Sequence, residues 1–458
     1  MKKHHYILTL LTWMAFANIS NAEIKEYKFA KIDSLLINNG SGFYRWRDIE
    51  AFPINTLDHY QRYSWSALEK EEGVYDFSII KRDAEKARLN LAGHSTLGFG
   101  VRCLVEGVEH SYPPYLDKNM SSWYSQNKKC WVPDWNNGYF LARIDSLFQA
   151  LSKEFKNDVR ISFIEIRTFG NWGEFHLWEF EKPIEPLTAI TPETLHKMID
   201  IHANAFPNKQ IIIMSDNNEA LEYAMSKKDL EYPIGWRRDS WANPHFNDIR
   251  EQKTWNLAKE RWKTAPVIVE SYGFGTGVQP KIGPEQVLEY HISDIGNGNF
   301  AKTNRELDQY SKENKDLLIK SASIAGYRYA PFSISFPSSI RKNGLMKIKS
   351  FWSNFGVAPV YRKWNVCYRL VDAKSNKIAW EGISKLNLKS LLPTIHDGKD
   401  KQVEILDEFP IPTNFNFGTY RLELVVIDPV GYLSPMKLGV SGRNKNGAYE
   451  FGSIKISK

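Results

Sequence analysis

Cysteine is scarce in this chain: Cys103, Cys130 and Cys367 are the only three among 458 residues. They form no CxxC pair and have no histidine at the spacing of a zinc site, which argues against a structural zinc. An odd number of cysteines leaves at least one thiol free. One disulfide is possible after export, and Cys103–Cys130 is the pair we consider for it.

Long apolar runs are also lacking, except at the start of the chain. The segment MKKHH is basic, YILTLLTWMAFA is apolar, and NISNA ends with small residues at Ser20 and Ala22. This pattern predicts a signal peptide over residues 1–22 and a secreted or periplasmic protein. The run is too short to span a membrane. No cysteine follows it, which argues against a lipid anchor at that site.

Charge of one sign is not concentrated anywhere in the sequence. The 60 basic and 53 acidic residues leave a formal net charge of +7, and the basic residues are scattered. Nucleic-acid binding therefore has little support. What the chain does have is aromatic residues, 14% of the total and including 15 Trp. Flat aromatic side chains either fill a core or serve as platforms for the apolar faces of sugar rings.

Strand-like and helix-like segments alternate from about residue 28 to residue 336, which is typical of parallel βα units. Eight segments read as strands: FAKIDSLLI or the nearby SGFYRW, then HYQRYSW, STLGFGVRC, RISFIEIRT, QIIIMSD, PIGWRRDS, APVIVES and AGYRYAPFSI. We therefore predict a (β/α)8 TIM barrel over residues 23–338. An open doubly wound sheet is the alternative, but it lacks the glycine-rich turn after its first strand.

The pattern changes after Pro337. Short alternating segments separated by turn residues follow, among them KWNVCYRLVDA and TYRLELVVIDPVG. No long helical pattern is present. Residues 339–458 are therefore predicted to form a C-terminal immunoglobulin-like β-sandwich.

Four acidic residues follow predicted barrel strands: Glu174, Asp216, Asp239 and Glu270. In a (β/α)8 barrel, side chains at the carboxyl ends of the strands face the reaction site. Cleavage of a glycosidic bond requires two carboxyl groups, one to protonate the leaving oxygen and one to attack or to activate water. Glu174 and Glu270 are our candidates for this pair.

Structural alternatives exist for each acid. Glu270 ends a buried strand and is expensive to bury unpaired, so a salt bridge to Arg237 or Arg238 is one alternative. Glu174 is otherwise an ordinary loop acid, although it lies between two tryptophans. Asp216 in SDNN is as consistent with an N-cap or an Asx turn as with a substrate contact. Asp239, with Arg237 and Arg238, is as consistent with an internal ion network as with binding of sugar hydroxyls. Further substrate-binding candidates near the predicted rim are Arg45, Arg47, Trp65, Arg102, Trp172, His176, Arg237, Tyr272 and His291.

Residues 63–102 carry a recognisable motif, with Trp65, then Leu68-Glu69, then Gly73-x-Tyr75-Asp76-Phe77 before a helix. The motif resembles the second βα unit of the large retaining clan of (β/α)8 glycoside hydrolases, in particular β-galactosidase-like members. The resemblance implies an acid/base glutamate after strand four and a nucleophile glutamate on strand seven. Glu174 and Glu270 stand at those places. The clan has Asn before the acid/base, where this chain has Gly173; Asn171 is the candidate substitute.

A second resemblance covers roughly residues 40–458. The segments GNWGEFH, GWRRDS, EYHISDIGNGNF and WSNFGVAPVY resemble a group of secreted bacterial barrel proteins with an appended β-sandwich. Together the two resemblances imply an exported glycoside hydrolase, with a galactose-type hexoside as substrate and no need for a metal or organic cofactor. The alternatives are a non-catalytic carbohydrate-binding barrel, or a lyase or hydrolase that uses Asp216 or Asp239.

Overall fold

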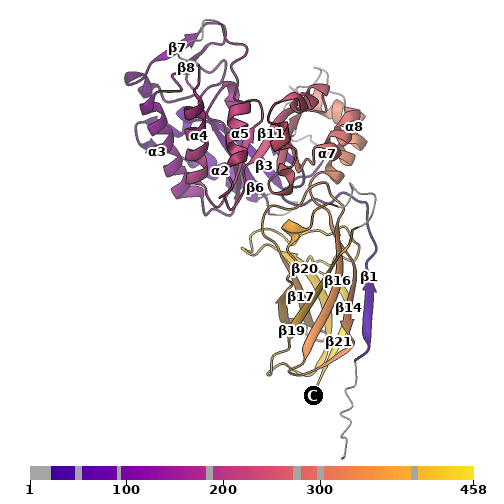
Figure 1. Ribbon diagram of the computed structural model, residues 1–458. Helices are drawn as coiled ribbons and strands as arrows, with labels where there is room; N and C mark the ends of the chain where they lie inside the picture. Colours follow the sequence, from indigo (N-terminus) through magenta and orange to yellow (C-terminus); the bar gives the residue numbers. More distant parts are fainter. Residues whose placement is uncertain are drawn as a thin grey trace, which may run out of the picture.

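The computed structural model consists of a barrel placed on one end of a β-sandwich (Figure 1). It describes residues 22–46, 54–89, 94–181, 189–271, 280–296, 304–393 and 401–458. The expected signal peptide, apart from its last residue, lies outside these ranges.

Eight parallel strands close into the barrel in chain order. They are β2 (Gly42–Trp46), β3 (Asp58–Ser64), β6 (Thr96–Arg102), β9 (Ile161–Ile166), β10 (Gln210–Met214), β11 (Gly235–Trp241), β12 (Val267–Ser271) and β13 (Asp294–Gly296). The closed sheet confirms the predicted (β/α)8 barrel and excludes the open doubly wound alternative. Of the two segments proposed for the first strand, SGFYRW is the correct one.

Helices surround the barrel (Figure 1). The α-helices are α1 (Trp65–Leu68), α2 (Ser78–Arg88), α3 (Gly138–Phe155), α4 (Pro192–Ala205), α5 (Asn218–Ser226), α6 (Trp255–Ala258), α7 (Gly283–Glu289) and α8 (Asn304–Ile324). The 3₁₀ helices are η1 (Pro114–Lys118), η2 (Asn171–Gly173), η3 (Pro244–Glu251), η4 (Arg261–Lys263), η5 (Pro280–Ile282) and η6 (Leu388–Ser390). Side chains that accept backbone N–H groups start several of them, as Thr191 does for α4. Two hairpins, β4–β5 (Glu69–Glu71, Val74–Tyr75) and β7–β8 (Ser122–Ser125, Cys130–Pro133), lie in the connections.

The prediction of the eighth barrel strand is wrong. The segment AGYRYAPFSI contains β14 (Tyr329–Pro337), which pairs antiparallel with β1 (Ile24–Lys28) and β16 (Leu345–Asn354) and so belongs to the sandwich. The barrel is closed instead by β13, which has only three residues. A three-residue strand is too short to show an alternating pattern, whereas the nine residues of β14 show a clear one.

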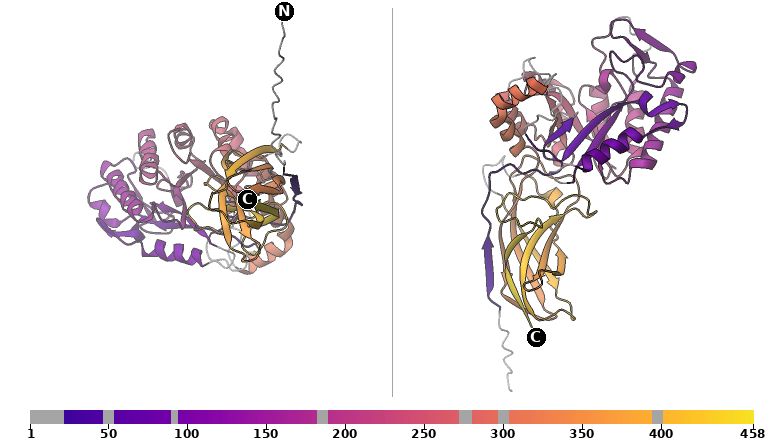
Figure 2. Two further views of the ribbon diagram at one scale, coloured as in Figure 1. Left: turned by 90° about the horizontal axis from the view of Figure 1, so that it is seen from below. Right: turned by 180° about the vertical axis from the view of Figure 1, so that it is seen from behind.

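Two sheets form the second unit, which is consistent with the predicted β-sandwich, although β1 and β14 come from the range 23–338 predicted for the barrel. One has the order β1-β14-β16-β19 and the other β15-β21-β20-β17-β18. The further strands are β15 (Ser339–Arg341), β17 (Asn365–Asp372), β18 (Ile378–Ile383), β19 (Val403–Pro410), β20 (Gly418–Ile427) and β21 (Tyr449–Ser457). Side chains from both sheets, such as Trp352 and Leu424, share one apolar core. Seen from behind, β1 runs along the outer edge of this sandwich (Figure 2).

Cys103, Cys130 and Cys367 are all free and buried, so the considered Cys103–Cys130 disulfide is not formed. Cys103 packs in the barrel core directly after β6, and Cys130 begins β8 opposite Ser125. Burial raises the pKa of the Cys130 thiol to about 11, which keeps it protonated and unreactive.

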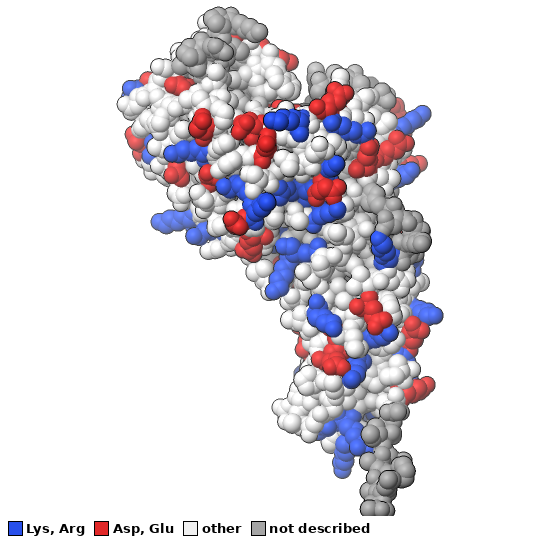
Figure 3. Space-filling view, in the orientation of Figure 1, with Lys and Arg blue, Asp and Glu red and all other residues white. Residues whose placement is uncertain are grey.

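Basic and acidic side chains are interspersed over the face shown in Figure 3, in agreement with their scatter in the sequence. No helix in the described ranges is both long and apolar enough to cross a membrane.

Strand alternation decides what fills the barrel. A layer of large side chains lies across its middle: Tyr44, Tyr60, Phe163, Ile212 and Ile268, with Trp46 beside them. Because side chains repeat with a period of two along each strand, the next inward residues lie above or below this layer. Towards the carboxyl ends these are charged residues. Towards the amino ends, which face the sandwich, they line a cavity.

Candidate active site

Six charged side chains form a closed ring above the aromatic layer, at the carboxyl end of the barrel. Arginine and glutamate alternate around it in the order Arg62, Glu174, Arg167, Glu165, Arg237, Glu270 and back to Arg62. We call this set the charge ring. Its formal charges sum to zero, which is the arrangement in which buried ions are tolerated.

Arg62, on β3, joins the two glutamates predicted as a catalytic pair. Its Nη1 donates to Glu174 Oε1 at 3.0 Å and its Nη2 to Glu270 Oε2 at 2.6 Å. The guanidinium group also stacks on the Trp46 ring, 4.4 Å from its centroid. One planar group therefore bridges an acid from the fourth βα unit and an acid from the seventh.

The other two arginines complete the ring. Arg167 lies 2.8 Å from Glu165 and 3.1 Å from Glu174. Arg237 lies 3.4 Å from Glu165 and pairs with Glu270. The structural alternative for Glu270, a salt bridge to Arg237, is thus present together with the bridge through Arg62.

The ring lowers the pKa of two of its acids, Glu174 and Glu165. Burial would raise the pKa of Glu174, but His176 and the charges of Arg62 and Arg167 hold that pKa well below its usual range. His176 Nε2 lies 3.7 Å from Glu174 Oε2. The pKa of Glu165 is also lowered despite complete burial, because Arg167 and Arg237 flank it. These two carboxylates therefore form ion pairs with the arginines and hold a proton less readily than an ordinary glutamate does.

Asp239 lies beside the ring and differs from Glu165 and Glu174 in its pKa. Its Oδ1 lies 3.4 Å from Arg237 Nε, on a side chain that is 26% exposed. Burial and the charge of Glu174 raise the pKa of Asp239 to about 6, although Arg237 and Arg62 oppose the shift. Because the ring is already neutral, a further negative charge there is unfavourable, and Asp239 holds its proton up to nearly neutral pH.

The backbone around Asp239 is irregular. The register of β11 against β12 shifts between Arg238 and Trp241, and the two strained residues Ser240 and Ala242 have φ of 72° and 63°. Positive φ is unfavourable for residues with a side chain and persists where the surroundings impose it, often at functional sites. Bulges of this kind re-aim a side chain at the rim of a barrel.

The turn that carries Glu174 is strained as well. Gly170, Trp172, Gly173 and Phe175 have φ of 85°, 53°, 72° and 62°. A Cβ at Gly173 would lie 2.3 Å from the Arg167 carbonyl oxygen, which explains why the Asn expected from the resemblance is missing there. Asn171 does not replace it, because its amide group contacts Glu106 instead.

Asp216 and Arg102 extend the site. Asp216 accepts from Arg238 Nη1 at 3.3 Å, and the N-cap of α5 is Asn217, so the cap alternative for Asp216 is wrong. Burial raises the pKa of Asp216, with Arg238 opposing. Burial and the nearby charge of Arg62 lower the pKa of Arg102 to about 10. Both side chains are therefore electrostatically part of the site.

Trp172, His176 and Trp178 form its outer edge. His176 stacks on Trp178, with 4.1 Å between ring centroids, and meets Trp172 edge-on at 6.2 Å. Trp178 is 73% exposed, which is unusual for so large an apolar side chain. An exposed aromatic face next to buried carboxylates is suited to the apolar face of a sugar ring.

Three predicted site residues lie elsewhere. Trp65 is fully buried and donates to Glu69 Oε2 at 2.7 Å, so it is a packing residue of α1. Arg45 alternates with Tyr44 and Trp46 on β2 and therefore faces away from the barrel interior. His291 precedes β13 at the opposite end of the barrel, where it stacks on Trp262 and bonds to the Val357 carbonyl oxygen. Arg47 and Tyr272 are outside the described residues.

Three residues of the ring, Arg62, Glu165 and Arg167, are not among the site residues predicted from the sequence. A usable signal was present, because Tyr60 and Arg62 share one face of β3, and Glu165 and Arg167 share one face at the end of β9. Charged residues of opposite sign on the inward face of neighbouring strands predict a buried ion network.

Space for the ring is provided by glycine on β6. A Cβ on Gly100 would lie 2.7 Å from Arg167 Cγ, and one on Gly98 would lie 2.2 Å from the Phe163 ring. The described residues contain no group of three His, Cys, Asp or Glu side chains suited to a metal.

Comparison with known proteins gives likenesses of structure. No protein-family profile matches the chain, and no curated protein sequence matches it. Endo-glycoceramidase II from Rhodococcus sp. is similar over 84% of this chain and 99% of its own, with 8% identity and a TM-score of 0.41. The catalytic domain of β-amylase from Paenibacillus polymyxa is similar over 60% and 98%, with 8% identity and a TM-score of 0.40. An endogalactoceramidase is similar over 76% and 94%, with 10% identity and a TM-score of 0.37. Likenesses this weak carry no argument about chemistry, so the function below is argued from the site.

Proposed function

We propose that this chain is an exported glycoside hydrolase that uses Glu270 as nucleophile and Glu174 as its partner carboxyl group. The observation that carries the proposal is that the guanidinium group of Arg62 contacts both carboxylates at the carboxyl end of the barrel. Glycosidases place two carboxyl groups around one bond, and barrel enzymes place them at this end.

The direct bridge favours retention of configuration. Retaining enzymes separate the two carboxyl groups by about 5–5.5 Å, and inverting enzymes by about 6.5–9.5 Å to admit a water. Two carboxylates that bond to the same guanidinium group fit the shorter spacing better. A galactose-type hexoside is the substrate that we propose, from the resemblance of residues 63–102, and Trp178 is the platform that we propose for its ring.

The source of the proton favours a second version of the same reaction. A general acid must begin protonated, whereas Glu174 is held ionised. Asp239, with a pKa of about 6, carries a proton at mildly acidic pH and lies beside the ring. In this version Asp239 protonates the leaving oxygen, and Glu174 holds Arg62 in position against Glu270.

A panel of aryl and alkyl glycosides tests the proposal, with purified wild-type protein and the variants Glu270→Gln, Glu174→Gln and Asp239→Asn. We expect Glu270→Gln to abolish turnover. Of Glu174→Gln and Asp239→Asn, the variant that removes the general acid should lose about 10²–10⁴-fold in kcat on alkyl glycosides. It should lose much less on nitrophenyl glycosides, because nitrophenolate leaves without a proton. Glu154→Gln, on the exposed surface, is the matched control.

Two outcomes would contradict the proposal. Turnover that survives Glu270→Gln would remove Glu270 as the nucleophile. Glycan binding with no turnover, in the wild type and in all variants, would instead support a non-catalytic carbohydrate-binding barrel. Export is tested separately, by sequencing the amino terminus of the mature protein from the periplasm or medium, where we expect cleavage after Ala22.

A further inference from the structure

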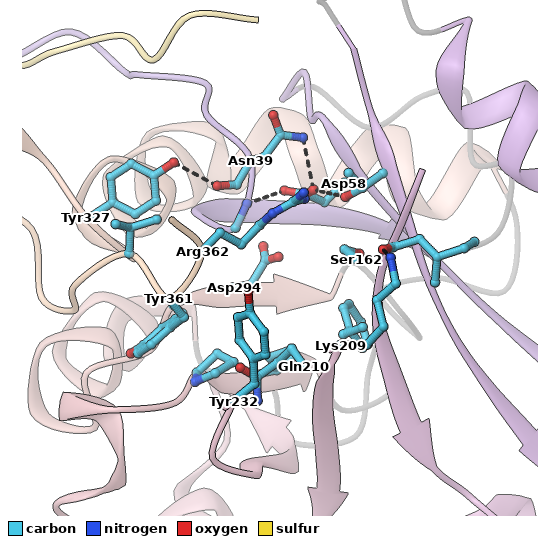
Figure 4. Close-up of a pocket in the computed structure, with 18 of the residues that line it drawn as sticks. Asn39, Asp58, Ser162, Lys209, Gln210, Tyr232, Asp294, Tyr327, Tyr361 and Arg362 are labelled. Atoms are coloured by element: carbon cyan, nitrogen blue, oxygen red, sulfur yellow. Dashed lines mark hydrogen bonds between the residues drawn. The ribbon is translucent and has the colours of Figure 1, made fainter. Parts of the chain in front are cut away.

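A polar cavity lies at the amino end of the barrel strands, opposite the charge ring. Figure 4 shows residues that line it. Its walls are the amino-terminal ends of barrel strands and the segment Val360–Arg362 of the sandwich unit. Its volume is about 140 Å³, which is roughly that of five water molecules in the liquid. Asn208 and Gly40 at its edge are exposed, so the cavity has a route to solvent.

Four residues that line the cavity each carry a buried polar atom that forms no hydrogen bond with any described residue. The atoms are Ser162 Oγ, Gln210 Oε1, Asp294 Oδ1 and Arg362 Nη1. They come from four separate segments of the chain, and Asp294 is only 4% exposed. Buried polar atoms in proteins nearly always have partners, so four of them around one cavity require an explanation.

The neighbouring side chains show which atoms are already committed. Asp58 accepts from Gly40 N, Thr96 Oγ1 and Asn39 Nδ2, at 2.6, 2.6 and 3.2 Å. Lys209 Nζ donates to two backbone carbonyl oxygens. Gln210 Nε2 likewise donates to two carbonyl oxygens, and its Oε1 has no partner among the described residues. The four unpartnered atoms are therefore what the cavity offers to a guest.

The polarity of these atoms is mixed. Arg362 donates, Gln210 accepts, Ser162 does both, and Asp294 does either according to its protonation. Burial and the charge of Asp58 raise the pKa of Asp294 well above its usual value, which favours the protonated form that both donates and accepts. Arg362 and Lys209 disfavour a cation, and Asp58 disfavours an anion. An uncharged guest rich in hydroxyl groups satisfies all four atoms, because each hydroxyl both donates and accepts.

We propose that this cavity is a binding site for a small neutral polyol, between a triol and a single sugar ring in size. The aromatic rings of Phe163, Tyr232, Tyr327 and Tyr361 on its walls supply apolar faces for the carbon skeleton. Such a site is separate from the charge ring, since the aromatic layer around Tyr60 lies between them. It does not depend on the proposed glycosidase activity.

The test is isothermal titration calorimetry of the full chain with glycerol, erythritol, xylose and myo-inositol, none of which contains a glycosidic bond. We expect saturable one-to-one binding of at least one of them. Arg362→Leu and Gln210→Leu should each weaken it at least tenfold, while Arg82→Leu on the exposed surface and Glu270→Gln in the ring leave it unchanged. Gln210→Leu removes no charge and provides the answer if Arg362→Leu does not fold.

The proposal is overturned if none of the four polyols binds saturably up to about 100 mM, because a cavity this well supplied with polar atoms then holds water only. It is also overturned if binding is lost in Glu270→Gln and kept in Gln210→Leu, which would assign the polyol to the charge ring instead.

Discussion

The two ends of the barrel interior accommodate buried carboxyl groups in opposite ways. At the carboxyl end, three arginines and three glutamates are buried as ions and neutralise one another in a ring. At the amino end, Asp294 is buried with no ion pair to any described residue, and its pKa is raised well above the usual value. Burial alone therefore does not decide ionisation. The number and sign of neighbouring charges do.

Glu165→Gln should give the largest effect, because it breaks the ring and leaves Arg167 and Arg237 facing each other. Removing one member of a buried ion pair costs about 3–5 kcal/mol. Urea unfolding at pH 7 measures the loss. A loss below about 1 kcal/mol, the size expected for an exposed ion pair, would show that the stability of the ring does not depend on the alternation of arginine and glutamate.

Gly100→Ala should destabilise by about 1–3 kcal/mol, the usual cost of overpacking a core. The new methyl group would lie 2.7 Å from Arg167 Cγ and 3.1 Å from the Glu165 carbonyl oxygen. Gly138→Ala is the matched control. Nothing lies within 4 Å of its Cβ, and in the first turn of α3 it should be neutral or stabilising. Equal effects of the two changes would contradict the close packing around the ring.

Asp239→Asn should alter how stability depends on pH. The pKa of Asp239 is about 6 in the folded chain, above the usual 3.8, so the folded state holds this proton more tightly than the unfolded chain does. Its contribution to stability is full below pH 4 and is lost as pH rises through 6. Asn cannot titrate. From pH 4.5 to pH 7 the free energy of unfolding of the variant should therefore rise by about 2 kcal/mol relative to that of the wild type.

The measurement is urea unfolding of both proteins at the two pH values. A constant difference between them would mean that Asp239 titrates normally. That result would also remove Asp239 as the acid in the second version of the reaction.

Asp294→Asn should give the smallest effect and is the direct counterpart of Glu165→Gln, because both replace a buried barrel carboxyl group by its amide. The pKa of Asp294 is raised well above its usual value, so the amide replaces a carboxyl group that favours its neutral form, and no ion pair is lost. We therefore expect less than about 0.5 kcal/mol of destabilisation at pH 5. At higher pH the variant should become relatively more stable, since it no longer has to hold a proton. Destabilisation as large as that of Glu165→Gln would erase the contrast between the two ends.

The architecture was largely predictable from the sequence, because seven of the eight barrel strands are long enough to show their pattern. β13 was not, since three residues carry no periodicity, and β14 took its place in the prediction because it has nine well-patterned residues. The convergence of Glu174 and Glu270 followed from the rule that strand ends share one rim.

The rest of the site depends on which way side chains face. Arg45 and His291 have the right chemistry but lie on the wrong face and at the wrong end, while Arg62 lies in mid-strand, where rim residues are not sought. Local spacing does not reveal the strained turns at Trp172 and Ser240, because tertiary packing imposes them. The polar cavity was also beyond the sequence, since its walls come from both structural units.

The most direct test of this contrast is a pH titration of the carboxyl groups by ¹³C NMR, with side-chain-labelled Asp and Glu and resonances assigned through the amide variants. We predict that Glu165 and Glu174 titrate at lower pH than the exposed glutamates, that Asp239 titrates near 6, and that Asp294 titrates well above the exposed aspartates. Titration of Asp294 together with the exposed acids, or protonation of Glu174 above pH 5, would contradict this prediction.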